Sequence, residues 1–214
     1  SHSHFDHTGG LRDVLRKMGR EVEVVAHPSI WINRYNRRQD KPDRFMGMPF
    51  SRQELENYGA CFNLSKDPVI INDNIITTGE VPMVTEYEEV GSERFIKEDS
   101  GWKPDGLLDD RALIVRIKQG LVIILGCAHR GIINTIYHAQ QLTGVERIYA
   151  VVGGAHLLNA SEERLRLTIS ALRELGVQKL GLCHCTGMPQ TAVLAQEFGD
   201  KFFFNNAGTS LELP

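Results

Sequence analysis

The chain has 214 residues, a formal net charge of −3 and a sequence isoelectric point near 6.2. Apolar residues make up 42% and charged residues 24%, a balance that argues against a disordered chain. A nucleic-acid-binding protein usually has a basic excess, and a membrane span needs about 18 apolar residues in a row. The four cysteines are too few and too scattered for a disulfide framework. We therefore expect a globular, cytoplasmic protein with neither nucleic acid nor membrane as a partner.

The first 30 residues alternate between helix and strand. A helix is expected over 8–18, because apolar residues recur at helical spacing from Leu11 to Met18 and Gly19 follows them. Residues 21–26 are expected to form a short buried strand. This alternation predicts an α/β fold built in layers.

Residues 31–105 have a different character, polar and rich in turn residues. Basic side chains, among them Arg34, Arg37 and Arg38, are interleaved with aromatic ones. Arginine suits bidentate contacts with phosphate, so this region can hold a phosphate and a flat ring. A solvated loop explains the same pattern equally well. We expect 31–105 to be a lid-like insertion in a single domain that covers the whole chain, 1–214.

The elements expected after residue 50 follow the usual patterns of capping, alternation and apolar runs. They are a helix capped at Ser51 with Glu54, strands over 68–71 and 75–78, a hairpin of 112–117 and 121–125, a helix over 132–142, a strand over 147–152, a helix capped at Ser161 and ending at Leu175, a strand over 179–182, a helix over 189–198, and strands over 201–204 and 209–213.

The chain begins with a cluster of metal-binding residue types, His2-x-His4-x-Asp6-His7. Imidazole and carboxylate groups are good ligands for zinc and related divalent ions. In a turn from extended chain into a loop, His2 and His4 can face one ion while Asp6 and His7 face a second. A histidine-tag remnant is the alternative, but the motif runs directly into the first expected helix, as tags do not.

Three further histidines lie just beyond expected strands, namely His129, His156 and His184. In open α/β layers, ligands gather beyond the carboxyl ends of strands. We therefore expect these three side chains to converge with the opening motif and to bind metal. His138 lies within a helix and is expected to be structural or exposed. His27 precedes a proline at a strand end, where a packing role is favoured over a role in the site.

Cys183 and Cys185 flank His184 and offer two readings. They can be thiolate ligands. On an extended segment, however, neighbouring side chains point to opposite sides, so a His184 that faces metal turns both cysteines away. We expect them to be small buried hydrophobic residues.

The opening motif resembles the signature of the metallo-β-lactamase superfamily, and His129 and His184 are similar to its third and last metal-ligand motifs. Further segments resemble the subgroup of 7,8-dihydropterin-6-methyl-4-(β-D-ribofuranosyl)aminobenzene-5′-phosphate synthases. These segments are Thr78–Pro82, Asp109–Leu113, Gly126–Thr135, Gly153–Leu157 and His184–Gly187. The resemblance implies an αββα four-layer sandwich.

The chain departs from the superfamily pattern at two places. Members commonly have an aspartate that bridges both metals where this chain has His156, and a neutral imidazole does not bridge as a carboxylate does. Members also have several strands before the opening motif. The resemblance therefore implies a domain that lacks its N-terminal strands and folds weakly unless another chain supplies them; a homo-oligomer is left open.

The implied activity is metal-dependent hydrolysis of a phosphate ester or a related electrophile. Two divalent ions, zinc or alternatively manganese or iron, activate a hydroxide. His2, His4 and His129 hold one ion; Asp6, His7 and His184 hold the other, with His156 nearby, and Asp6 orients the nucleophile. Two alternatives remain for a small, phosphorylated or pterin-like partner: a synthase that condenses a dihydropterin with an aminobenzene ribofuranosyl phosphate, and a metal-bound metabolite sensor without catalysis.

Overall fold

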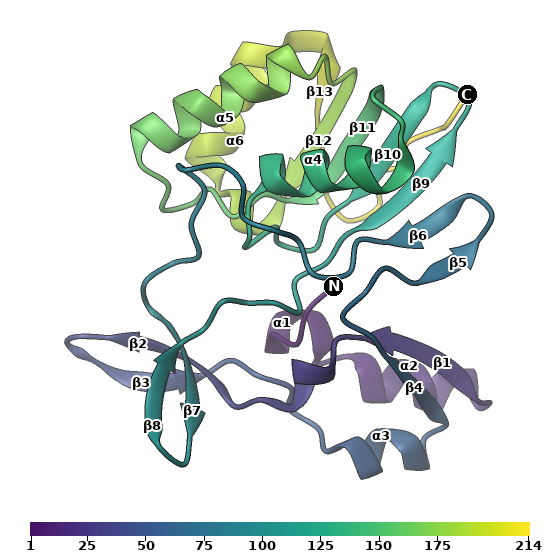
Figure 1. The fold of residues 1–214 in the computed structure, drawn as a ribbon, viewed down its shortest axis with the longest axis vertical. Coiled ribbons are helices and arrows are strands. Elements are labelled where there is room, and N and C mark those ends of the chain that lie inside the picture. Colours follow the sequence, from purple (N-terminus) through teal and green to yellow (C-terminus); the bar gives the residue numbers. More distant parts are fainter.

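The largest of three sheets is the centre of the molecule (Figure 1). The computed structural model describes residues 1–214. The seven strands of this sheet run in the order β13-β12-β11-β10-β9-β6-β5. They are β5 (Ile70–Asn72), β6 (Ile75–Thr77), β9 (Leu113–Ile117), β10 (Gly120–Ile124), β11 (Ile148–Gly154), β12 (Lys179–Cys183) and β13 (Phe202–Phe204). Strands β10 to β13 pair in parallel, whereas β9 and β10 form the expected antiparallel hairpin.

Three helices connect the four parallel strands one after another. They are α4 (Ile132–Thr143), α5 (Glu162–Glu174) and α6 (Met188–Phe198). Consecutive crossovers of the usual right hand place all three helices on one face of the sheet. The main core of 22 buried residues lies between them and the strands. Ser161 caps α5 as expected, its side chain accepting the backbone N–H of Arg164.

A smaller parallel pair of strands, β1 (Val22–Ala26) and β4 (Ala60–Leu64), forms the second sheet. Helices α2 (Leu11–Met18) and α3 (Arg52–Asn57) pack on it through a small cluster of Leu15, Leu55 and Ala60. The Ser51 side chain accepts the N–H of Glu54 at the start of α3, so the expected cap is confirmed. A single turn, α1 (Phe5–Thr8), precedes α2.

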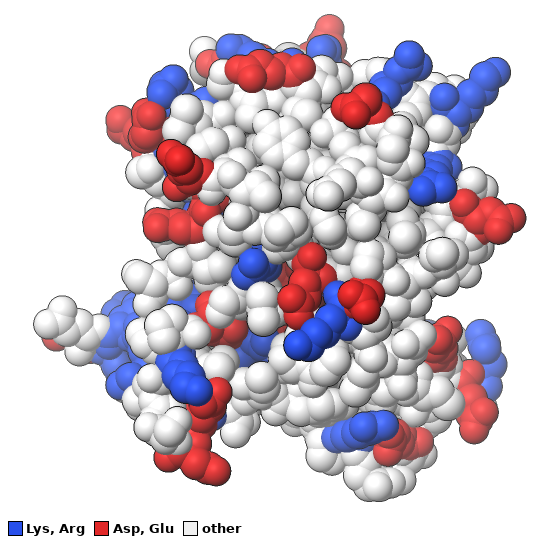
Figure 2. Space-filling model, viewed as in Figure 1, with Lys and Arg blue, Asp and Glu red and all other residues white.

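The third sheet is antiparallel, in the order β3-β2-β7-β8. Its strands are β2 (Arg34–Arg38), β3 (Lys41–Phe45), β7 (Arg94–Glu98) and β8 (Gly101–Pro104). Tyr35 packs edge-on against both Phe45 and Trp102, and the Arg37 guanidinium lies 4.1 Å above the Trp102 ring. Figure 2 shows Lys and Arg side chains gathered at the β2–β3 hairpin.

Residues 31–105 contribute strands to all three sheets, because β4 pairs with β1, β5 and β6 extend the large sheet, and β2, β3, β7 and β8 form the third. The predicted mixed α/β layering is confirmed, with two differences in detail. The helix expected over 8–18 begins only at Leu11. The strand expected over 209–213 is absent, because the sheet ends at β13 and the chain turns back where Thr209 N–H bonds Asn206 O.

Three short 3-10 turns complete the chain: η1 (Pro28–Trp31), η2 (His184–Thr186) and η3 (Gly199–Lys201). None of the helices has the length and apolar character needed to cross a membrane.

Candidate metal centre

The candidate site lies at the carboxyl edge of β10, β11 and β12. His129 lies in the loop after β10, His156 lies just beyond β11, and His184 directly follows β12. Parallel strands end at one edge, so their following loops meet there. The segment before α1 reaches the same edge, which brings His7 next to His184 although 177 residues separate them in the sequence.

The three strand-end loops hold unusual backbone conformations. Ala128, His156 and His184 have φ values of 50°, 46° and 55°, in the left-handed region. That region costs a residue with a side chain roughly 1–2 kcal/mol, and such strain persists where the surroundings impose it, often at functional sites. The loops are therefore shaped by their tertiary setting rather than by local preference.

The first group of donor atoms comes from His2, His4 and His129, all of which are buried. His2 Nε2 lies 3.0 Å from His4 Nδ1, and the His129 ring centroid lies 4.8 and 4.9 Å from the centroids of His2 and His4. A tetrahedral zinc ion with Zn–N bonds of 2.0–2.1 Å would place two nitrogen ligands about 3.3 Å apart. The facing nitrogens of His2 and His4 are thus spaced like two ligands of one ion.

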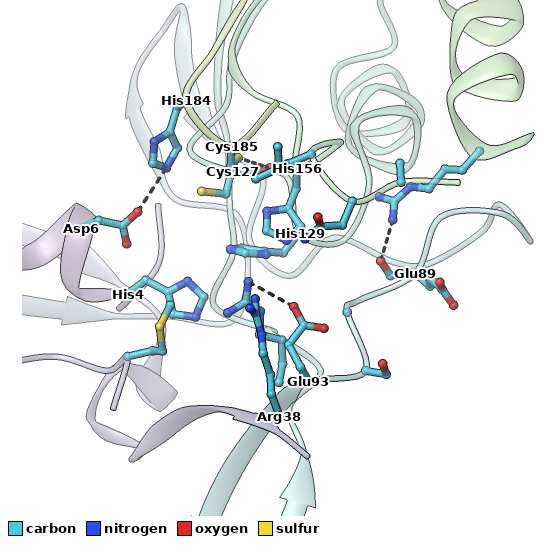
Figure 3. Close-up of a pocket in the computed structure, with 18 residues that line it drawn as sticks. His4, Asp6, Arg38, Glu89, Glu93, Cys127, His129, His156, His184 and Cys185 are labelled. Carbon is cyan, nitrogen blue, oxygen red and sulfur yellow. Dashed lines mark hydrogen bonds and ion pairs between the residues drawn. The ribbon is translucent and has the colours of Figure 1, made fainter. Parts of the chain in front are cut away.

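The second group comes from Asp6 and His7, on the turn α1, and from His184. His7 Nε2 lies 3.2 Å from His184 Nε2, and Asp6 Oδ2 lies 3.2 Å from His184 Nε2 (Figure 3). Asp6 Oδ2 is 3.7 Å from His7 Nε2. This group is more open than the first, with half of the Asp6 side chain exposed. The turn α1 begins at Phe5, between the two pairs of the opening motif, yet the rings of His2 and His7 approach to 4.4 Å between centroids.

Burial keeps the histidines of the first group neutral. Loss of solvation lowers the pKa of His4 to about 3 and lowers the pKa values of His2 and His129 well below their ordinary range. Desolvation also lowers the pKa of His7. A neutral imidazole has a free lone pair, so these rings are ready to bind a cation at neutral pH.

Carboxylates behind the first group fix its orientation. His2 Nδ1 lies 3.0 Å from Ser1 Oγ and 3.6 Å from Asp110 Oδ1, which leaves Nε2 facing His4. A polar partner behind a histidine orients the ring of a metal ligand in this way. Desolvation, with the charge of Asp109 next, raises the pKa of Asp110 to about 7. Asp109 Oδ2 accepts the N–H of Ser3, the residue between His2 and His4.

His156 reaches the site but stands apart from both groups. Its ring centroid lies 4.1 Å from that of His129, and its Nδ1 is buried without a hydrogen-bond partner. Its ring nitrogens, like the donor atoms of His4 and Asp6, are not among the two sets of three donor atoms that lie within 4.8 Å of one another. A role of His156 as a metal ligand stays a prediction.

The three arginines expected to bind substrate lie in different places. Arg34 is buried and its guanidinium is paired with Asp105 and Asp109 at 2.8 and 2.9 Å. The expectation for Arg34 is therefore corrected to a structural role. Arg37 pairs with Asp43 outside the cavity, whereas Arg38 lines the cavity beside the site.

The cysteines also differ from the expectation. Cys185 lines the cavity, and its thiol lies 3.6 Å from the carbonyl oxygen of Cys127, so it does not point away from the site. The reason is that His184 begins the turn η2 with a positive φ, where the alternation of an extended strand no longer holds. Cys183 does face away, towards Asn205.

Cys127 is a site residue that the sequence reasoning missed. Its Sγ lies 3.1 Å from His7 Nε2. The available signal was its position two residues before His129 in Gly-Cys-Ala-His.

Two other histidines are structural. His27 is buried, where Nδ1 accepts the N–H of Ser29 and Nε2 lies 2.8 Å from Glu80. His138, on α4, bonds the carbonyl oxygen of Thr78.

A cavity of about 770 Å³ opens beside the two groups of donor atoms. Arg94 and Arg164 join Arg38 in its lining, where Arg94 Nη2 lies 3.7 Å from Glu93 Oε1 and Arg164 Nη1 donates to the carbonyl oxygen of Glu89. Arg94 Nε and two of the three Arg164 nitrogens are buried without a hydrogen-bond partner. The cavity is therefore a polar site with unused cationic donors.

The residues present fit two divalent ions. Both ring nitrogens of His129 are buried without a hydrogen-bond partner, an arrangement that costs free energy unless a bound ion uses a lone pair. Three donor atoms, from His2, Cys127 and His129, lie within 4.8 Å of one another, as do those of His7, Cys127 and His184. Imidazole with carboxylate or thiolate suits zinc or iron better than manganese, magnesium or calcium.

Comparisons with known proteins agree with this geometry. The chain is 31% identical over 217 aligned positions to 7,8-dihydropterin-6-methyl-4-(β-D-ribofuranosyl)-aminobenzene-5′-phosphate synthase of Methanocaldococcus jannaschii, across 97% of this chain and 72% of that protein. It is 29% identical to an uncharacterized protein of the same archaeon, across 97% of this chain and 75% of that protein. No family model matches the chain.

A solved structure shows the same fold. The crystal structure of a metal-dependent hydrolase of the β-lactamase superfamily superposes with a TM-score of 0.84 and 29% identity, covering all of this chain and 77% of the other. The chain therefore belongs to the metallo-β-lactamase superfamily. Its predicted resemblance to the dihydropterin-linked synthase subgroup is confirmed by the 31% identical relative.

Proposed function

We propose that this chain is a metal-dependent hydrolase that cleaves a phosphate ester or a related electrophile. The observation that carries the proposal is the convergence of two groups of donor atoms at one sheet edge, beside a cavity with unused guanidinium donors. His2, His4 and His129 would hold one ion, and Asp6, His7 and His184 the other. When bound, two divalent ions lower the pKa of water towards neutrality and polarise a phosphoryl oxygen.

The protein's own groups would position the reactants. The half-exposed carboxylate of Asp6 lies at the mouth of the second group, where it can accept a hydrogen bond from the attacking water. Arg38, Arg94 and Arg164 can neutralise a phosphate in the cavity, since guanidinium groups bind phosphate oxygens in pairs. The wall that carries Arg38 and Arg94 belongs to the sheet of β2 and β7, which supports a covering role for part of 31–105.

The direct test is turnover of a panel of phosphate monoesters, phosphodiesters and lactones. We expect activity that a chelator removes and that zinc, manganese or iron restores. His129→Ala should lower kcat/KM by at least about 100-fold, since loss of an outer partner alone costs 10–100-fold. His138→Ala is the matched control, a histidine outside the site. Activity indifferent to chelation, or equal losses in both variants, would sink the proposal.

Arg38→Ala tests the substrate class. Loss of a hydrogen bond to a charged group costs about 1.5–3 kcal/mol, so KM for a phosphate ester should rise about 10–100-fold while KM for a lactone stays nearly constant. Arg44→Ala, on the adjacent strand β3, is the control because Arg44 does not line the cavity.

The synthase relative supports a second candidate function. In this reaction the chain would join a dihydropterin to an aminobenzene ribofuranosyl phosphate in the same cavity. Product analysis with both substrates distinguishes it from hydrolysis, because only condensation yields a product that contains both rings. Tight binding of an unaltered phosphorylated or pterin-like ligand, with no product after long incubation, would instead support a metal-bound sensor.

A further inference from the structure

Cys127 belongs to two sets of donor atoms, one with His2 and His129 and one with His7 and His184. Its Sγ lies within 4.8 Å of the donor nitrogens of His2 and His129, and within 4.8 Å of those of His7 and His184. Its closest approach is 3.1 Å, to His7 Nε2. Figure 3 shows Cys127 between His184 and His129.

From this position we propose that Cys127 is a metal ligand whose thiolate bridges the two ions. The inference rests on the two-metal centre of the proposed function, but it does not depend on which reaction that centre performs. A thiolate sulfur has several lone pairs, whereas each imidazole nitrogen has one. Each histidine nitrogen at this edge can therefore bind one ion, whereas the thiolate of Cys127 can bind two.

The charges of the site favour an additional anion between the ions. Apart from Cys127, the groups proposed as ligands are imidazoles and the single carboxylate Asp6, so only Asp6 among them can carry a negative charge. The Asp6 side chain is half exposed, and its Oδ2 lies 3.2 Å from His184 Nε2. Two divalent ions in a buried site need compensating negative charge. Cys127 is 2% exposed and supplies that charge where the two groups meet.

The surrounding backbone holds Cys127 in this place. The next residue, Ala128, has a left-handed φ of 50°, which turns the chain between Cys127 and His129. The end of β11 approaches closely at Gly154, where an added Cβ would lie 2.7 Å from Cys185 Sγ and 2.6 Å from Gly126 O. Cys185 in turn donates to the carbonyl oxygen of Cys127. The position of Sγ is thus set by two loops and not by one flexible side chain.

Binding of the ions releases a proton from this group. A thiol binds a metal ion as the thiolate, so coordination would replace the S–H bond of Cys127 with sulfur–metal bonds and release the proton to the solvent. Thiolate ligation favours zinc or iron over manganese.

Cobalt(II) substitution tests the inference by a spectroscopic signal that does not depend on activity. The full chain loaded with two equivalents of cobalt(II) should show sulfur-to-cobalt charge-transfer absorption. Cys127→Ser should lose that absorption and bind zinc on the order of 100-fold more weakly. Cys185→Ser and Cys183→Ser, which make the same change at neighbouring thiols, should keep the absorption.

A second measurement covers the case in which Cys127→Ser does not fold. The triple variant Cys61→Ser, Cys183→Ser, Cys185→Ser retains Cys127 as the chain's remaining thiol. X-ray absorption of its zinc form should show zinc–sulfur scattering at about 2.3 Å. Three results would overturn the Cys127 assignment alone. The chain could bind two ions without any sulfur signal, the sulfur signal could persist in Cys127→Ser, or it could disappear in Cys185→Ser. Failure of the wild-type chain to bind any divalent ion would overturn the proposed function as well.

Discussion

Arg34 ties the segment that carries His2 and His4 to the loop before β9. Its Nε and Nη2 pair with Asp105 and Asp109, and its Nη1 donates to Ser3 Oγ at 2.7 Å. Asp109 also accepts the N–H of Ser3 at 2.9 Å. The change Arg34→Ala would therefore leave two buried carboxylates without their cation and release the residue between the two histidines.

The expected loss of stability is large. Removing one partner of a buried ion pair costs about 3–5 kcal/mol, because the remaining charge stays buried without compensation. For a chain of this size, each kcal/mol lowers Tm by roughly 2–4 °C, so Tm should fall by roughly 6–20 °C. Metal affinity should fall about 10–100-fold, as it does when outer partners of a metal site are removed.

Thermal melts of the metal-free and zinc-loaded chain, with metal titration, measure both effects. Arg37→Ala is the matched control on the same strand. Arg37→Ala removes a partly exposed ion pair with Asp43 and the stacking of the guanidinium on Trp102. Because about a third of each side chain in the pair is exposed, the loss of folding stability should stay below about 2 kcal/mol. If Arg34→Ala raised KM while Tm and metal affinity stayed unchanged, Arg34 would be a substrate ligand and the structural reasoning would be wrong.

Two further predictions concern residues away from the metals. Burial raises the pKa of Glu88, although its carboxylate accepts the N–H groups of Ile133 and Asn134 at the start of α4. A pKa raised on folding adds stability below the unfolded value of about 4.5 that is lost as pH rises through the folded value. The Tm of the wild type minus the Tm of the neutral variant Glu88→Gln should therefore be larger at pH 4 than at pH 7. Thermal melts in which this difference grows as pH rises would contradict the argument. His27→Ala should lower the folding stability by about 1–3 kcal/mol, because it removes the cap on Ser29 N–H and the bond to Glu80. Elemental analysis should find the number of metal ions per chain unchanged, and a lost ion would make His27 a metal ligand.

Much of the fold follows from local patterns in the sequence. The caps at Ser51 and Ser161 and the hairpin about Gly120 appear as expected, because each depends on residues a few positions apart. The range 31–105 could not be assigned in this way. Its strands are short, and their partners in three different sheets lie far away in the sequence.

For individual site residues, too, the role depends on partners that lie far away in the sequence. Arg34 and Arg38 have the same charge and lie four residues apart, yet one is locked among buried aspartates and the other lines the cavity. Charge alone does not tell which end of a strand has acidic partners. Cys185 was misjudged because a positive φ at His184 replaced the alternation expected of an extended strand.

The sequence by itself determined the chemistry available: an opening run of histidines and an aspartate, and three histidines just beyond strands. It could do so because ligand types and strand ends are local properties. The tertiary structure decided which of these atoms meet. It placed Cys127 between the two groups and buried Arg34 in ion pairs with Asp105 and Asp109. Contacts across more than a hundred residues depend on how sheets and loops pack.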